Sequence, residues 1–148
     1  METEIERKFL VKSQDFKSLA ANHYNIVQGF LNKDKHRTVR IRIKGLKGYI
    51  TVKGISTNDG LSRLEWEKEI DYDEAKSLLE LCEKPLLYKT RFEIEFKGNL
   101  FEVDEFHKQH RGLVIAEIEL QHKDEPFERP QWLGKEVTGN EAYYNSQL

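Results

Sequence analysis

The sequence predicts an α+β fold that is mainly antiparallel β, with eight strands and a few peripheral helices. Apolar residues alternate with polar or charged residues in one segment after another, as at Val39, Ile41 and Ile43, and a period of two is typical of strands. Short turns rich in Gly and Asn separate these segments, and such turns join antiparallel neighbours. Two segments instead repeat apolar residues at helical intervals.

The alternating segments define the predicted strands. They cover residues 2–12, 24–34, 36–45, 48–55, 62–71, 87–97, 100–107 and 113–122. The turns Gly45–Gly48, Ser56–Gly60 and Gly98–Asn99 lie between them, so strands that follow one another in the sequence are expected to pair. Eight strands are enough to close a barrel.

Helices are predicted where the strand pattern is interrupted. Asp71 and Glu74 have the spacing of a capping box, and apolar residues then recur at helical intervals until Pro85 ends the run. Ser13 can cap a shorter helix after the first strand. Residues 140–147 are a third candidate.

The length favours a single domain over residues 1–148. The 24 Lys and Arg nearly cancel the 26 Asp and Glu, so long-range attraction to nucleic acid or an anionic membrane is not indicated. The N-terminus has no apolar signal-peptide region, and residues 113–116, the longest uncharged apolar stretch, are too few to span a bilayer. We therefore expect a cytoplasmic protein without a nucleic-acid or membrane partner.

Several common functional sites lack a signature in this sequence. Cys82 is the only cysteine, which excludes an intramolecular disulfide and a thiolate metal cluster. The histidines show no HxH or HExxH spacing, and no Walker loop, GxGxxG or nucleophile elbow is present. A functional site must therefore be sought among the many charged residues.

Charged residues recur two positions apart on the predicted strands, often as pairs of one sign, and side chains at this spacing share a face. These rows are Glu2, Glu4, Glu6 and Lys8; Arg40, Arg42 and Lys44; Arg63, Glu65, Glu67 and Glu69; Lys89, Arg91, Glu93 and Glu95; Glu102 and Asp104; and Glu117 and Glu119, with Lys53 alone on its strand. A sheet with one solvated face could carry any single row. Because like charges at this spacing repel one another, their recurrence on many strands predicts bound partners of both signs.

Divalent metal ions and phosphate oxygens are the partners that suit these rows. Pairs of glutamates provide the carboxylate oxygens that hard cations such as Mg²⁺ prefer. Arginine and lysine bind phosphate oxygens, Arg through its planar fork and Lys as a point charge. A complex of a polyphosphate with metal ions would use both sets at once.

The first predicted strand carries an ExExK motif, Glu4-Ile5-Glu6-Arg7-Lys8, which resembles the signature of the CYTH superfamily, also called the triphosphate tunnel metalloenzymes. The rest of that pattern follows in order over essentially the whole chain, as Arg40-x-Arg42, Lys53, Glu65-x-Glu67, Lys89-x-Arg91, Glu117-x-Glu119 and Leu133-Gly134-Lys135-Glu136-Val137-Thr138. The resemblance implies an eight-stranded antiparallel barrel that is open as a tunnel, with these charges on its inner face.

The resemblance also implies roles for the charged residues. The residues implied to hold a triphosphate are Lys8, Arg40, Arg42, Lys53, Lys89 and Arg91. The residues implied to hold one or two Mg²⁺ or Mn²⁺ ions are Glu4, Glu6, Glu65, Glu67, Glu117 and Glu119. We expect Glu4, Glu6 and Lys8 to act in catalysis, with Lys8 neutralising charge that develops on the transferred phosphoryl group.

The expected activity is metal-dependent hydrolysis of a triphosphate, with inorganic tripolyphosphate cleaved to pyrophosphate and phosphate. Three alternatives stay open: a class IV-type adenylate cyclase that forms cyclic AMP and pyrophosphate from ATP, a thiamine triphosphatase, and a non-catalytic polyphosphate-binding module. If the charges face inward, the strands turn their apolar residues outward, and three short helices can cover few of them. We therefore also expect a homodimer joined through an outer barrel face.

Overall fold

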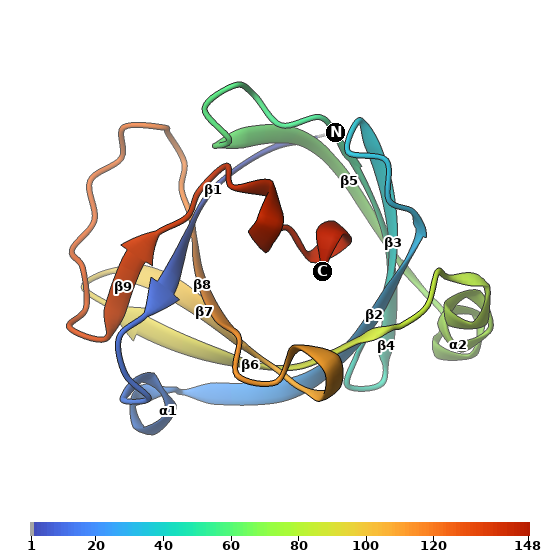
Figure 1. Cartoon of the computed structure of the whole chain (residues 1–148), viewed down its shortest axis with the longest axis horizontal. Helices are drawn as coiled ribbons and strands as arrows, with labels where there is room; N and C mark the ends of the chain where they lie inside the picture. Colours follow the sequence, from blue (N-terminus) through green and yellow to red (C-terminus); the bar gives the residue numbers. More distant parts are fainter. Residues whose placement is uncertain (1) are drawn as a thin grey trace.

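The computed structural model describes residues 2–148 and contains a closed antiparallel β-barrel (Figure 1). Its strands are β1 (Glu2–Val11), β2 (Asn22–Asn32), β3 (Arg37–Lys44), β4 (Lys47–Gly54), β5 (Ser62–Ile70), β6 (Leu87–Phe96), β7 (Asn99–Phe106), β8 (Val114–Glu119) and β9 (Leu133–Glu136). The order around the barrel is β5-β4-β3-β2-β6-β7-β8-β1, and pairing of β5 with β1 closes the ring. The predicted eight-stranded closed barrel is confirmed.

The further strand, β9, is missing from the prediction because its four residues are too few to establish a period of two. Glu6 N–H donates to the carbonyl of Leu61, just before β5, and the carbonyl of Lys8 accepts from Val137 N–H, just after β9. Backbone groups of residues two apart on a strand point to the same edge. β5 and β9 therefore pair with the same edge of β1. β5 pairs with its first half, and β9 pairs with its second half.

Two α-helices, α1 (Phe16–Leu19) and α2 (Tyr72–Leu81), lie outside the ring (Figure 1). At the start of α2, Asp71 accepts from the backbone N–H of Asp73, and the Glu74 carboxylate accepts from the N–H of Asp71. The predicted capping box is confirmed. Ser13 does not cap α1, because Asp15 holds the N-cap position and makes no side-chain cap bond. No helix within residues 2–148 is long and apolar enough to cross a membrane.

Short 3₁₀ turns complete the described chain. They are η1 (Lys108–His110), η2 (Glu141–Tyr143) and η3 (Asn145–Gln147). The last two replace the predicted C-terminal helix, and Figure 1 shows this segment turned into the centre of the ring. Leu148 packs there against the cluster of buried residues formed by Phe30, Leu87, Phe106 and Ile115. The C-terminal segment thus fills one end of the barrel.

The main apolar clusters lie between the barrel wall and the elements outside it. Phe101 and Trp132 are buried and pack edge to face, with ring centroids 5.6 Å apart, in the larger cluster beneath α1 and the loop before β9. A second cluster packs Ala75 of α2 against Ile41 of β3. Other residues on the outer face stay exposed, among them Trp66 of β5, at 41%. The loop between β8 and β9, residues 120–132, thus covers a part of the outer barrel surface that the helices do not cover.

The capping box gives a first prediction. Asp71→Ala is expected to lower the free energy of unfolding by about 1 kcal/mol, because the Asp73 N–H loses its acceptor at the start of α2. Urea denaturation measures this change. Asp73→Ala removes a charge from the same turn without removing a capping bond. It should therefore lower the free energy of unfolding by only about 0.3 kcal/mol. Equal losses in the two variants would contradict the capping role.

Candidate active site

The barrel encloses a charged cavity of about 190 Å³. All the site residues predicted from the sequence line it: Glu4, Glu6 and Lys8 on β1, Arg40 and Arg42 on β3, Lys53 on β4, Glu65 and Glu67 on β5, Lys89 and Arg91 on β6, and Glu117 and Glu119 on β8. The faces assigned from alternation therefore converge, as antiparallel strands with inward-pointing residues two apart require. The roles of these residues stay predictions.

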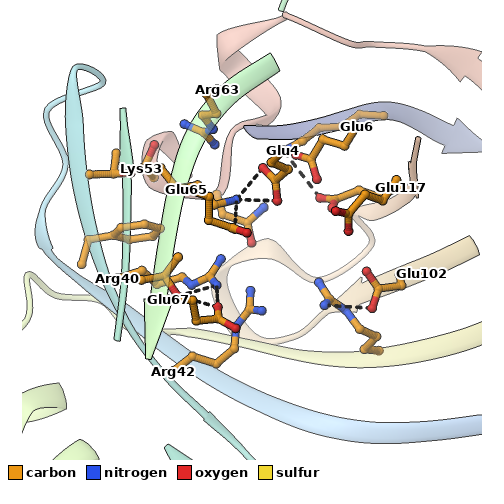
Figure 2. Close-up of a pocket in the computed structure, with 18 of the residues that line it drawn as sticks. Glu4, Glu6, Arg40, Arg42, Lys53, Arg63, Glu65, Glu67, Glu102 and Glu117 are labelled. Carbon is orange, nitrogen blue, oxygen red and sulfur yellow. Dashed lines mark hydrogen bonds and ion pairs between the residues drawn. The ribbon is translucent and has the colours of Figure 1, made fainter. Parts of the chain in front are cut away.

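Three carboxylates of the cavity lie apart from two of its guanidinium groups, whereas Glu67 lies beside Arg40. In Figure 2, Glu4, Glu6 and Glu117 lie together on one side, with Arg40 and Arg42 across from them. A ligand in this cavity would meet acidic and basic side chains at the same time.

Lysines partly neutralise the group of carboxylates that contains Glu4, Glu6 and Glu117. Lys53 Nζ lies 2.9 Å from Glu4 Oε1 and 3.5 Å from Glu65 Oε2, and Lys8 Nζ lies 3.6 Å from Glu117 Oε1. Burial would raise the pKa of Glu117, but the nearby positive charges, Lys8 foremost, outweigh burial and lower this pKa to about 2. Glu117 therefore stays ionised in the cavity.

Glu6 is in the opposite situation. Burial raises its pKa to about 8, and the negative charges of Glu117 and Glu4 add to this effect. A cation bound among these carboxylates would remove the repulsion and favour the ionised form of Glu6. The carboxylate oxygens are also the donor type that Mg²⁺ and Mn²⁺ prefer, so the residues fit such an ion.

The cavity carboxylates have the right chemistry for a divalent cation, but their side chains are not arranged as a set of metal ligands. Among residues 2–148, no three His, Cys, Asp or Glu side chains are already arranged to hold a metal ion. Glu4 and Glu117 instead contact Lys53 and Lys8. A metal ion bound there would compete with these lysines for the carboxylate oxygens.

The basic side chains are held by hydrogen bonds and ion pairs. Arg91 Nε and Nη2 donate to the two carboxylate oxygens of Asp104, at 2.7 and 2.9 Å, and Lys89 Nζ lies 2.7 Å from Asp104 Oδ2. Arg40 Nη2 lies 3.4 Å from Glu67 Oε2. Arg40 Nε is buried and has no hydrogen-bond partner within the described residues, so it is a donor that a phosphate oxygen could satisfy.

The assignment from sequence missed several residues at the cavity. Arg63 and Glu102 line the cavity, and both belong to charged rows recognised by spacing. Asp104 belongs to such a row too, and it pairs with Lys89 and Arg91. Parity alone could have included these three residues. Asn145 and Ser146 also line the cavity, but they lie on η3, and no periodic pattern indicates that the C-terminal segment folds back inside the barrel.

The environment of Lys89 gives a prediction about pH. Burial lowers its pKa to about 7, although the charge of Asp104 opposes this shift. Above pH 7 the amine is mostly neutral, and an anion that favours the charged form should draw a proton onto it. Tripolyphosphate binding without metal at pH 8 should therefore take up more protons in the wild type than in Lys89→Met.

Calorimetry in buffers of different ionisation enthalpy measures this proton uptake. The affinity of the wild type should also fall as the pH rises from 7 to 9, with a smaller fall in Lys89→Met. Identical proton uptake in the two proteins would show that Lys89 does not titrate on binding.

Comparisons with known proteins agree over the full length of the chain. The CYTH domain model matches residues 2–147. The inorganic triphosphatase of Acetivibrio thermocellus is 50% identical over 149 residues, covering 100% of this chain and 94% of that protein. The inorganic triphosphatase of Nitrosomonas europaea is 34% identical over 150 residues, covering 99% and 96%.

A solved structure gives the same result in three dimensions. The crystal structure of the inorganic triphosphatase NE1496 matches with a TM-score of 0.67 and 30% identity, covering 97% of this chain and 95% of that chain. The order of the charged pairs, the closed barrel and these full-length matches agree. The chain belongs to the CYTH domain family.

Proposed function

We propose that this chain is a metal-dependent triphosphatase that hydrolyses inorganic tripolyphosphate to pyrophosphate and phosphate. The observation that carries the proposal is the convergence of acidic and basic pairs from separate strands on one enclosed cavity. The two relatives matched over almost their full length are both named inorganic triphosphatase, which supports the same reaction.

The basic residues would hold the phosphate chain. A triphosphate carries about four to five negative charges. Moving these charges from water into the cavity without positive partners would cost several kcal/mol for each charge. Lys8, Arg40, Arg42, Lys53 and Arg91 offer positive charges around the cavity, and Lys89 would add one when it takes up a proton on binding. Arg40 also brings the buried Nε donor that lacks a partner among the described residues. Together these groups would offset the lost hydration of the substrate.

The acidic residues would hold one or two Mg²⁺ or Mn²⁺ ions through Glu4, Glu6, Glu65, Glu67, Glu117 and Glu119. When bound, such ions would withdraw charge from phosphate oxygens and lower the pKa of an attacking water. Glu4 and Glu6 would orient that water, and Lys8 would neutralise charge on the transferred phosphoryl group. Lys8 suits this role because its side chain is nearly buried, and its ammonium lies 3.6 Å from Glu117 within the acidic group.

The cavity favours an inorganic substrate over ATP or thiamine triphosphate. Phe30 is the single aromatic residue among the described residues that line it, and it belongs to the buried cluster against which Leu148 packs at the filled end of the barrel. A nucleobase or a thiamine ring would find little apolar surface to stack on there. Adenylate cyclase and thiamine triphosphatase activities are therefore less well supported.

A substrate panel tests the proposal. Tripolyphosphate, ATP and thiamine triphosphate should each be incubated with Mg²⁺ and with Mn²⁺, while phosphate, pyrophosphate and cyclic AMP are measured. We expect tripolyphosphate to be cleaved fastest, with equal amounts of phosphate and pyrophosphate and with no turnover in EDTA. Cyclic AMP as the main product would favour the cyclase. Tight binding without any turnover would favour a binding module.

We further propose that the chain acts in the cytoplasm as a homodimer, with a triphosphate as its small-molecule partner and neither nucleic acid nor a membrane bound. Leu64 and Trp66 of β5 are 48% and 41% exposed on the outer barrel face, and a second copy could cover them. Sedimentation equilibrium at micromolar concentration should give twice the mass of the chain. A monomer under these conditions would reject the dimer.

A further inference from the structure

Gln28 of β2 is an uncharged residue that is fully buried beside the charged cavity, with an exposed fraction of 0%. Its Oε1 accepts from two nitrogens of Arg42, Nε at 2.9 Å and Nη2 at 2.7 Å. Its Nε2 donates to Asn145 Oδ1 at 2.8 Å. Arg42 is thus held by two hydrogen bonds to one neutral amide.

Two other cavity arginines, Arg40 and Arg91, are paired with carboxylates. Arg91 is bound by both oxygens of Asp104, and Arg40 lies 3.4 Å from Glu67. Arg42 forms no ion pair with any residue in 2–148. Burial lowers the pKa of Arg42 well below its usual range, and the positive charge of Arg40 adds to this effect. The geometry therefore fixes the Arg42 guanidinium without cancelling its charge.

The hydrogen bonds explain why an amide, and not a carboxylate, suits position 28. Arginine and lysine donate hydrogen bonds and cannot accept them, so Gln28 must turn its oxygen toward Arg42. Its NH₂ group then needs an acceptor, and it shares Asn145 Oδ1 with Lys89 Nζ, which lies at 2.7 Å. A glutamate would place a second oxygen against Asn145 Oδ1. Rotating the Asn145 amide would only turn its NH₂ group toward Lys89.

We propose that Gln28 is a positioning residue for phosphate recognition, which orients the Arg42 guanidinium and leaves its positive charge available to the substrate. This inference rests on the proposed function, because it requires a phosphate oxygen as the partner of Arg42. A charged fork that is already oriented loses little conformational entropy when the anion binds. Gln28 would therefore improve binding without touching the substrate itself.

The variant Gln28→Glu tests the proposal, because it keeps the size and the acceptor for Arg42 but adds a compensating negative charge. We expect KM for tripolyphosphate to rise at least tenfold, with a smaller change in kcat, and we expect weaker calorimetric binding of tripolyphosphate without metal. Gln14→Glu makes the same chemical change at an exposed position outside the barrel, and it should leave KM unchanged.

A double-mutant cycle separates positioning of Arg42 from general damage. In an Arg42→Met background, Gln28→Glu should no longer raise KM, because its effect acts through the guanidinium. Gln28→Met keeps the side-chain length without adding charge, so it should raise KM less than Gln28→Glu does. Gln28→Met also replaces Gln28→Glu as the test variant if the latter fails to fold, with a rise in KM expected only when Arg42 is present.

Three results would overturn the inference while wild-type turnover stays intact. They are an unchanged KM in Gln28→Glu, an equal rise in KM in the Arg42→Met background, and an unchanged KM in Gln28→Met. If the wild type neither binds nor cleaves tripolyphosphate, the proposed function fails, and the inference fails with it. The two failures are therefore distinguishable.

Discussion

Glu6→Gln is expected to lower kcat/KM for tripolyphosphate by a factor of about 10²–10³, the range seen when one preorganised charge-stabilising group is removed from an active site. Glu6 lies in the carboxylate group with Glu4 and Glu117, and burial beside these charges raises its pKa to about 8. The amide keeps the shape of the side chain but cannot bind a divalent cation as a carboxylate does. Phosphate release at saturating and limiting substrate, with Mg²⁺ present, measures the loss.

A residue on the same strand provides the control for this prediction. Glu2 is exposed near the start of β1, outside the ExExK motif, so Glu2→Gln removes the same charge from the strand while leaving the cavity lining intact. We expect its kcat/KM to stay within a factor of two of the wild type. If Glu6→Gln keeps wild-type activity, or if Glu2→Gln loses as much, the carboxylates inside the barrel are not the catalytic group.

Asp104→Asn is expected to lower the free energy of unfolding by about 3–5 kcal/mol, because removing one partner leaves buried positive charges uncompensated. Asp104 is 3% exposed and pairs at 2.7 Å with both Lys89 Nζ and Arg91 Nε. Burial alone would raise the pKa of Asp104, but Arg91 and Lys89 together hold it well below its usual range. Urea denaturation at pH 7 without ligand measures the loss.

The neighbouring residue on β7 gives a matched comparison. Glu105 lies on the opposite face of the strand and pairs with the partly exposed Lys17 at 2.7 Å. Exposed ion pairs contribute little, so Glu105→Gln should cost less than about 1 kcal/mol. The pairs of Asp104 stabilise the native state above pH 4, and this contribution is lost as the pH falls toward the lowered folded pKa. A cost in Asp104→Asn no larger than that in Glu105→Gln would contradict this account.

The sequence predicts the barrel and much of the cavity because side chains two positions apart on a strand point to the same face of the sheet. Arg40 and Arg42 point the same way on any strand, and so do Lys89 and Arg91. The structure brings both pairs, with the acidic pairs, to one cavity. The family resemblance supplied what parity could not, namely that the charged face is inside.

The residues missed from the sequence show where this reasoning ends. Gln28 and Asn145 are uncharged, so they belong to no row of like charge, yet they connect Arg42 to Lys89 through hydrogen bonds. Asn145 lies 117 positions after Gln28 in the sequence, and their contact depends on how the C-terminal segment folds into the barrel. The register of such a segment is set by tertiary packing, here of Leu148 against the buried cluster that contains Phe30, and no local periodicity encodes it.

The most direct test of the central claim is a crystal structure with Mn²⁺ and diimidotriphosphate, in which NH groups replace both bridging oxygens and prevent hydrolysis. Anomalous scattering would locate the metal. We predict Mn²⁺ bound by carboxylates of the group that contains Glu4, Glu6 and Glu117, with the phosphate chain along Arg40 and Arg42 inside the barrel. Metal and phosphate bound only to the outer surface, with the cavity side chains unchanged, would contradict the account.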